Sequence, residues 1–508
     1  MKTLARGEES PAAQARDGDR QRPRLGLPTK LAYGLGSMAF GVKDAGFQTF
    51  LLLFYNQLVG LPSLWVSGAI ALALVVDACV DPMVGQVSDH WRSRWGRRHP
   101  FMYAAALPLA LSYLLLWNPP HASHSFLFFY LLTTAVVVRT FITCYEIPSS
   151  ALVAELTQNY DERTGLLSYR SIFGYFGGLG MGLLAYLVFL RPTAAYPQGQ
   201  LNPHGYSAYG VTSAVVMFTT IILSAAGTQR FVPFLHRPTE APKKLSKFVR
   251  EMFSTLSHRS FLMTLGAGSF ASMGGGVHAA LTLYFATFFW ELSSAQISLL
   301  VIDSFVGAVA GSLLAPWLGR QMGKKAAALT SLTLTIPASL LPFLLRFGGL
   351  FPANHSPWLV PALVGTVAIG NTLGITTGIL ISSMIADVVE DSQLRTGRRS
   401  EGLFFAASAF TGKLVSASGL FSAGLLLWLV AFPTAARPGQ VDPHILTRLV
   451  WTYMPIFAGL MLVSVGFLGF YDISRHRHEE NLRRASEAAA IAEAAAEAGA
   501  PRIQPVAD

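Results

Sequence analysis

Charged residues are scarce in this sequence, since Asp, Glu, Lys and Arg make up 13% of its 508 residues while 52% are hydrophobic. The mean hydropathy is +0.43. These values exclude a set of ordinary soluble domains. Short strands separated by regularly spaced turn residues are also missing, which argues against a transmembrane β-barrel. The sequence therefore predicts an all-α integral membrane protein.

Cysteine is nearly absent as well, because the chain has only Cys79 and Cys144, both in apolar segments. They predict neither a structural disulfide nor a metal-binding cluster. HExxH, GxSxG and Cys/His clusters at ligand spacing are missing, which argues against a membrane enzyme. We expect no cofactor. The first 30 residues lack the apolar core of a cleavable signal peptide, so we expect the first helix to act as an uncleaved insertion signal.

Long apolar runs are what the sequence has in abundance. A spanning helix needs about 20 mostly apolar residues, and about twelve such runs occur. They cover roughly residues 31–56, 62–88, 100–117, 124–146, 166–190, 208–229, 260–289, 297–318, 325–346, 358–386, 402–432 and 449–471.

Lys and Arg are distributed unevenly between these runs. They cluster in the N-terminal tail, after the second, eighth and tenth runs, in the middle loop and beyond the twelfth run. The alternate loops hold mainly Arg191, Arg346, Arg437 and Arg448. By the positive-inside rule, both termini are cytoplasmic and the number of spans is even. The net charge of +10 follows mostly from this bias and predicts no nucleic-acid partner.

A polar stretch divides the runs six and six. We expect a cytoplasmic tail at 1–30, a six-helix bundle at 31–230, a cytoplasmic loop at 231–258, a second six-helix bundle at 259–472 and a cytoplasmic tail at 473–508. Basic, Gly-containing hairpins follow both the second and the eighth run, which indicates a repeat. Two such halves resemble the major facilitator superfamily.

Two aspartates stand four residues apart in the second run. At this spacing, Asp77 and Asp81 project from one helical face. Each charge at mid-membrane costs about 2.5 to 3.5 kcal/mol, and the two carboxylates repel each other. A bound cation or a proton would relieve both costs, because hard cations take oxygen ligands. The alternative is that one of them only bridges to an Arg or Lys on another helix.

Other polar groups also interrupt the apolar runs. Six of them predict a charged cavity: Lys43, Asp44, Arg139, Glu146, Arg170 and Lys413. For the lone groups Asp303, His278 and Asn371, we expect interhelical hydrogen bonds rather than ligand contacts. A channel would need a ring of like groups along a pore, whereas these charges alternate in sign.

The paired aspartates belong to a longer motif. Asp77-Ala78-x-x-Asp81-Pro82-x-x-Gly85, followed by Arg92-Ser93-Arg94-Trp95-Gly96-Arg97-Arg98, resembles the glycoside-pentoside-hexuronide:cation symporter family, the melibiose permease-like branch of the major facilitator superfamily. The similarity continues at Lys43-Asp44, at Tyr145-Glu146-Ile147-Pro148, at Tyr169-Arg170 and at Lys413. It spans nearly the whole chain except the tails.

That resemblance implies symport of a sugar, glycoside or uronic-acid-like solute with Na⁺, Li⁺ or H⁺ by alternating access. Asp77 and Asp81 would ligate the alkali cation, with Lys413 reaching the same site. The substrate would bind Asp44, Glu146 and Arg170, together with Lys43, and Arg139 is a further candidate. Carboxylates accept sugar hydroxyls, and a guanidinium offers a planar fork to vicinal oxygens.

Three positions depart from the family pattern. Glu146 stands where the melibiose permease has an Asp, and Ser150 and Gly378 stand where it has sugar-facing tryptophans. A stacking platform for a galactosyl ring is therefore missing at Ser150 and Gly378. Animal relatives of the family carry lysolipids, so symport of a lysolipid or of another amphiphilic or anionic solute is the alternative reading.

The cytoplasmic motifs predict a gate between the two halves. Residues of one half, Asp89, Arg92, Arg94, Arg97 and Arg98, would pair with Asp387, Arg399 and Glu401 of the other. For any single Arg, positive-inside topology and helix capping explain the charge better, so the gate is a prediction for the set as a whole. From the resemblance we expect a monomer in the lipid bilayer of a bacterial inner membrane, with a solute and a coupling cation as its partners.

Overall fold

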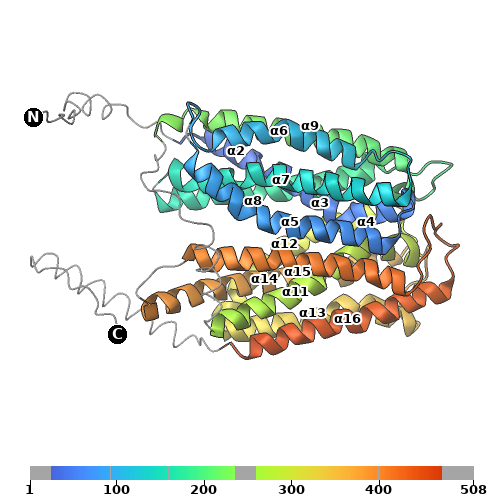
Figure 1. Ribbon diagram of the computed structural model, residues 1–508. Coiled ribbons are helices and arrows are strands. Elements are labelled where there is room, and N and C mark those ends of the chain that lie inside the picture. Colours follow the sequence, from blue (N-terminus) through green and yellow to red (C-terminus); the bar gives the residue numbers. More distant parts are fainter. Residues whose placement is uncertain (1–24, 92, 158, 235–258, 397–400, 472–508) are drawn as a thin grey trace, which may run out of the picture.

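A computed structural model describes residues 25–91, 93–157, 159–234, 259–396 and 401–471. All regular structure in this part of the chain is helical (Figure 1). The N-terminal half contains α2 (Leu27–Leu35), α3 (Ser37–Ala45), η1 (Gly46–Phe50), α4 (Leu51–Leu53), η2 (Phe54–Leu58), α5 (Ser63–His90), α6 (His99–Leu116), α7 (His124–Leu156), α8 (Tyr160–Leu184), η3 (Ala185–Phe189), η4 (Gly199–Leu201), α9 (Pro203–Gln229) and η5 (Val232–Phe234). The C-terminal half contains α11 (Arg259–Tyr284), η7 (Phe285–Phe289), α12 (Ser294–Met322), α13 (Lys324–Phe347), α14 (Leu359–Thr396), α15 (Glu401–Leu429) and α16 (Pro443–Gly469).

These elements form long rods that correspond to the twelve expected spans. Ten helices of the described part are long and apolar enough to cross a membrane. The other two rods are the first, which π-helical turns divide between Leu27 and Leu58, and α11, which is rich in Gly and Ser. The predicted all-helical membrane fold of the major facilitator type, with six rods in each half, is confirmed.

Several helices extend beyond the apolar runs that predicted them. The first begins at Leu27 rather than near residue 31, α7 continues to Leu156, and α14 continues to Thr396. Hydropathy marks only the part of a helix that lies in hydrocarbon, whereas the backbone hydrogen bonds continue into the polar region. The predicted boundaries at these ends were therefore too short.

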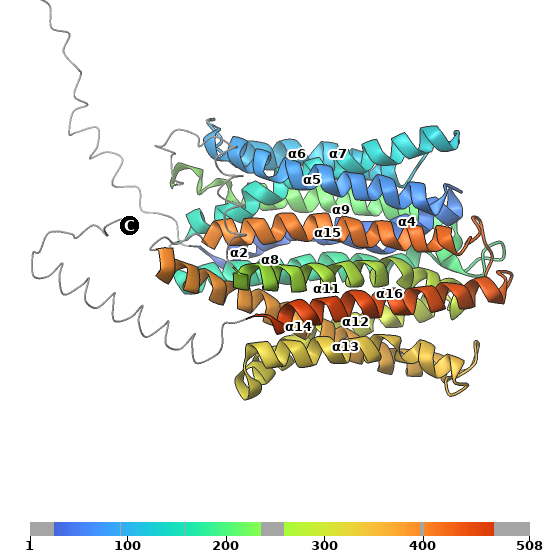
Figure 2. The ribbon, with the colours of Figure 1, turned by 60° about the horizontal axis from the view of Figure 1, so that its bottom comes forward.

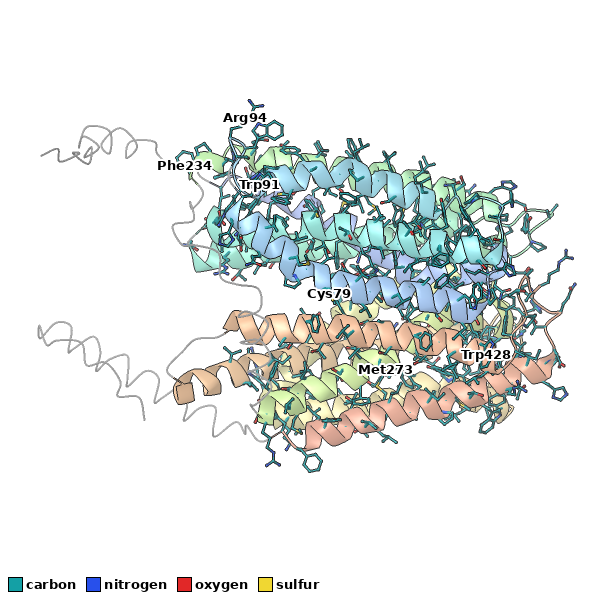
Figure 3. All side chains as sticks on the ribbon, in the orientation of Figure 1. Cys79, Trp91, Arg94, Phe234, Met273 and Trp428 are labelled. Atoms are coloured by element: carbon teal, nitrogen blue, oxygen red, sulfur yellow. The ribbon has the colours of Figure 1, made fainter. Side chains whose placement is uncertain are left out.

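The rods lie side by side in two bundles, with α2–α9 in one and α11–α16 in the other (Figures 1 and 2). Helix α5 packs along α15, α8 packs along α12, and η1 of the first rod packs against α11, so each half contributes three rods to the boundary. The first turns of α2 and the last turns of α16 lie at the same end of the molecule, as an even number of spans requires. Exposed tryptophans, among them Trp91 and Trp428, lie toward opposite ends (Figure 3), as is typical of membrane interfaces.

Hydrogen bonds join the two halves at the end opposite the termini. Gln57 donates from Nε2 to the carbonyl of Pro433 at 3.0 Å and accepts the amide of Ala436 at 2.9 Å. Gln200 donates to the carbonyl of Leu292 at 2.9 Å and accepts the hydroxyl of Ser294 at 2.8 Å. These bonds close the molecule on the side that the charge bias assigns to the exterior.

Glycines bring α3 against α8. A Cβ at Gly41 would lie 2.0 Å from the carbonyl oxygen of Gly174, and one at Gly177 would lie 2.5 Å from the carbonyl oxygen of Met38. Small residues at such contacts let helix backbones approach closely in lipid. This approach places the acidic residue Asp44 of α3 next to the charged residues of α7 and α8.

The close contact predicts a position-dependent effect of adding a single methyl group. Gly177→Ala forces the backbones apart, so we expect it to destabilise the protein by about 1–3 kcal/mol. At Gly180, three residues further along α8, a Cβ meets nothing within 4 Å, so Gly180→Ala is the matched control and should be neutral or slightly stabilising. The measurement is thermal unfolding in detergent. Equal melting temperatures of the two variants would contradict the close packing.

Candidate functional site

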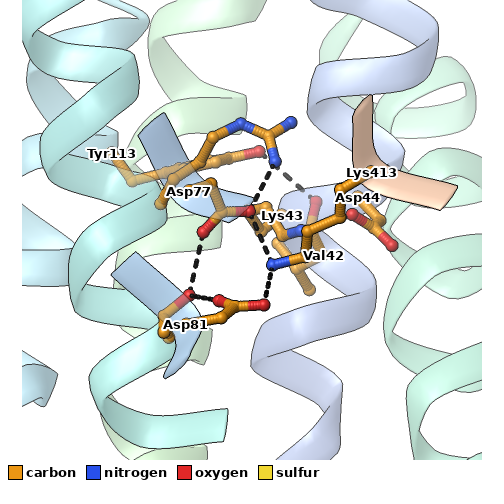
Figure 4. A network of polar contacts seen from close by, with 9 residues as sticks. Val42, Lys43, Asp44, Asp77, Asp81, Tyr113 and Lys413 are labelled. Atoms are coloured by element: carbon orange, nitrogen blue, oxygen red, sulfur yellow. Dashed lines mark hydrogen bonds and ion pairs between the residues drawn. The ribbon is translucent and has the colours of Figure 1, made fainter. Parts of the chain in front are cut away.

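A cavity of about 660 Å³ lies between the two halves near the middle of the rods. Charged side chains of α3, α5 and α7 line it from the N-terminal half, and Lys413 of α15 lines it from the C-terminal half (Figure 4). Seven of the predicted site residues meet here: Lys43, Asp44, Asp77, Asp81, Arg139, Glu146 and Lys413. The eighth, Arg170, lines an adjoining cavity and pairs with Glu146.

The two aspartates hold the ammonium group of Lys413 between them. Lys413 Nζ lies 2.9 Å from Asp77 Oδ2 and 2.5 Å from Asp81 Oδ2. Asp77 is 3% exposed, and a carboxylate so deeply buried requires a compensating charge. Because the aspartates belong to α5 and the lysine to α15, this contact is an ion pair between the halves.

A second cation and a hydroxyl complete the surroundings of Asp77. Arg139 Nη1 lies 3.3 Å from Asp77 Oδ2, and its guanidinium lies 4.7 Å from the ring centre of Phe47. Thr143 Oγ1 lies 2.9 Å from Asp77 Oδ1 and 3.0 Å from Asp81 Oδ1. Thr143 was not among the predicted site residues. Its position on α7, four residues after Arg139 and three before Glu146, could have identified it because these positions share one helical face.

The threonine contact has a chemical consequence. A hydroxyl donates one hydrogen, so Thr143 can donate to only one of the two aspartates at a time. The other carboxylate oxygen then faces an oxygen lone pair at hydrogen-bond distance. A proton on that carboxylate, or a cation shared by the three oxygens, stabilises the arrangement.

A second ion pair involves Glu146, which follows Thr143 by three residues on α7. Arg170 of α8 pairs with Glu146, and its Nη1 donates to Ser149 Oγ at 3.0 Å and to the Tyr33 hydroxyl at 3.4 Å. Glu146 Oε2 is buried without a hydrogen-bond partner in the described part of the chain. This oxygen is therefore an unused acceptor on a residue that lines the cavity.

Lys43 and Asp44 form the third pair. Lys43 is buried, its ammonium lies 4.2 Å from the ring centre of Phe40, and it pairs with the neighbouring Asp44. The Asp44 side chain is 33% exposed. It lines both the charged cavity and an adjoining one of about 670 Å³ that extends toward α8 and α12. Asp44 can therefore meet a ligand in either cavity.

The lone polar groups behave largely as expected. His278 Nδ1 lies 2.6 Å from the hydroxyl of Tyr453, and Asn371 donates to Ser304 at 3.5 Å, and both are contacts between helices. Asp303 is buried, and its Oδ2 has no partner among the described residues. Cys79 and Cys144 are free thiols.

Four of the predicted gate residues form ion pairs within their own halves: Asp89, Arg97, Arg98 and Asp387. Arg97 and Arg98 both bind Glu155, Arg98 also binds Asp89 at 3.2 Å, and Asp387 binds Lys324 at 2.6 Å. Arg94 lies over the ring of Trp95 near the end of the molecule (Figure 3). Arg92, Arg399 and the side chain of Glu401 lie outside the described residues. Pairing across the halves remains a prediction.

The family model, the related sequences and the solved structure that resemble this chain are all described as transporters or symporters. A family model described as MFS/sugar transport protein matches residues 32–475. An uncharacterized symporter of Synechocystis is 26% identical, with 90% of this chain and 96% of the relative covered. An isoprimeverose transporter of Lactiplantibacillus pentosus is 24% identical, with 88% of each chain covered. The solved nucleoside transporter NupG is similar in fold, with a TM-score of 0.60 over 88% of this chain and 100% of that one at 13% identity.

The pairing of Glu146 with Arg170 predicts non-additive effects on stability. Glu146→Gln or Arg170→Met leaves one buried charge unpaired, and we expect each to cost about 3 kcal/mol. The double variant removes both charges and should cost clearly less than the sum of the two. Thermal unfolding in detergent of the four proteins completes the cycle. Additive losses would contradict a direct pair.

Proposed function

The chain belongs to the MFS/sugar transport protein family, and from this premise we propose that it carries a sugar, glycoside or uronic-acid-like solute together with Na⁺ or H⁺. A member of this family is a multi-pass membrane transporter and not an enzyme. We also propose that it works in a bacterial inner membrane, as a monomer and without a cofactor.

One observation carries the proposal: a cation from one half, the Lys413 ammonium, lies between two carboxylates of the other half. An alkali cation or a proton competes with Lys413 for the same oxygens, since the two aspartates and Thr143 present oxygen atoms of the kind that hard cations prefer. Binding of the coupling ion then weakens the ion pair between the halves.

This competition provides a route from ion binding to movement. With the coupling ion at Asp77 and Asp81, Lys413 is released and the two halves can rock about the central cavity. If the ion raises the affinity for the solute, the solute raises the affinity for the ion by the same factor. One charge moving down 100 mV supplies about 2.3 kcal/mol, which corresponds to about 50-fold accumulation.

The solute-binding side of the cavity is formed by the other two pairs. Glu146 Oε2 and the partly exposed Asp44 carboxylate accept hydrogen bonds from hydroxyl groups, and Arg170 donates from a planar fork. These groups suit a molecule with several hydroxyls, or one that carries a carboxylate next to hydroxyls.

A second candidate function is symport of a lysolipid or another amphiphile. The observation that favours it is the adjoining cavity of about 670 Å³, whose wall includes Leu179, Leu283 and Val301. An acyl chain could lie along this wall while a polar head meets Asp44 and Arg170.

The proposal is tested by uptake into proteoliposomes under a Na⁺ or H⁺ gradient, with a panel of monosaccharides, disaccharides, uronic acids and a lysolipid. We expect one solute class to accumulate, and Asp77→Asn or Asp81→Asn to abolish accumulation because the ion site loses a charge. Asp442→Asn is the matched control, since Asp442 caps α16 far from the cavity and Asn also caps helices. Unchanged accumulation in both cavity variants would refute ion coupling at this site.

Thr143 should affect the ion more than the solute. Thr143→Val removes the hydroxyl shared by the aspartates, so we expect the ion concentration for half-maximal uptake to rise at least about tenfold, since hydrogen bonds to charged groups contribute about 1.5–3 kcal/mol. Thr134→Val on the same helix is the control, because its hydroxyl bonds only to backbone. A shift in solute affinity at saturating ion, with no shift for the ion itself, would argue against this role.

A further inference from the structure

A third cavity, of about 600 Å³, lies inside the C-terminal half, where residues of α11, α13, α14, α15 and α16 line it. It is continuous with the charged cavity, because Ser272, Gly275 and Gly412 line both. We call it the neutral recess. Its size lies within the range of about 300–1,000 Å³ that is typical of ligand pockets.

The chemistry of the neutral recess differs from that of the charged cavity. Among the described residues that line it there is no Asp, Glu, Lys or Arg, and its polar groups are the hydroxyls of Ser and Thr, the amide of Asn371 and the ring of His278. Uncharged donors and acceptors of this kind match sugar hydroxyls and supply no charge to balance that of an ion or a carboxylate.

The volume of the neutral recess exists where glycines have no side chain. A Cβ built at Gly275, Gly374, Gly378 or Gly412 meets nothing within 4 Å, so all four positions border open volume.

Two polar side chains of the neutral recess, His278 and Ser408, have atoms that can bond to a ligand. The hydroxyl of Tyr453 lies 2.6 Å from His278 Nδ1, which fixes the ring and leaves the second ring nitrogen for another partner. Ser408 Oγ is buried without a hydrogen-bond partner in the described residues. A buried polar atom without a partner is unfavourable, and a ligand hydroxyl would satisfy it.

We propose that the neutral recess is a second subsite, which takes an uncharged polyhydroxylated unit of the solute while a first unit binds at Asp44, Glu146 and Arg170. The solute is then a glycoside of at least two units rather than a monosaccharide. This inference rests on the proposed function and narrows its substrate class.

The proposal is tested with substitutions that reduce the volume of the neutral recess and leave every charged residue unchanged. Gly374→Leu and Gly378→Leu extend into the open volume, and Gly466→Leu is the control on α16, where a Cβ also meets nothing and none of the three cavities is lined. A panel of disaccharides with their constituent monosaccharides is measured by protection from thermal unfolding and by competition for uptake.

In the wild type and in Gly466→Leu, we expect the best disaccharide to bind at least tenfold more tightly than its constituent monosaccharides. In Gly374→Leu and Gly378→Leu, the affinity for that disaccharide should fall at least tenfold, while the affinity for the monosaccharides changes less than twofold.

Two results would overturn the subsite: unchanged disaccharide affinity in both filled variants, or a wild type that binds monosaccharides best. The proposed function fails separately. If a disaccharide protects the wild type but not the filled variants, and no ion gradient drives its accumulation, the subsite stands and ion-coupled symport is wrong.

Discussion

The cost of holding charge inside a membrane protein is the constraint on which this structure depends. Four cationic and four acidic side chains gather around the central cavities, and each has a partner of opposite sign within ion-pair distance. Charges that are unpaired in a low-dielectric interior are far more costly than paired ones. The balance keeps the site stable without a ligand and makes it sensitive to any ion that replaces one member.

Lys413 differs from the other seven charged residues of the cavities because it lies in the C-terminal half, on α15. Its contacts with Asp77 and Asp81 link the halves at mid-membrane, whereas Gln57 and Gln200 link them at the outer end through neutral hydrogen bonds. An ion pair responds to added cations, and a neutral hydrogen bond does not. The ion-sensitive contact therefore lies at the site and not at the outer closure.

Glycines have two different effects on helix packing in this structure. In the N-terminal half, Gly41 and Gly177 let the backbones of α3 and α8 come into contact. In the C-terminal half, Gly374 and Gly378 face open volume, and the bundle is hollow. The same residue type allows a close helix contact at one position and borders open volume at another, because the position of the neighbouring helices decides which occurs.

The sequence by itself determined the membrane class, the division into two six-helix halves and most of the charged site, because apolar runs and intramembrane charges are costly enough to be read one residue at a time. It did not determine where helices end in the polar region, and it missed Thr143, since a threonine in an apolar run has no such cost. The contact of Lys413 with Asp77 depends on how two helices that are far apart in the sequence pack together. The same holds for Gly378, which borders a cavity rather than a packed neighbouring helix. Only the tertiary packing of the two halves decided these contacts, since no local pattern fixes the distance between remote helices.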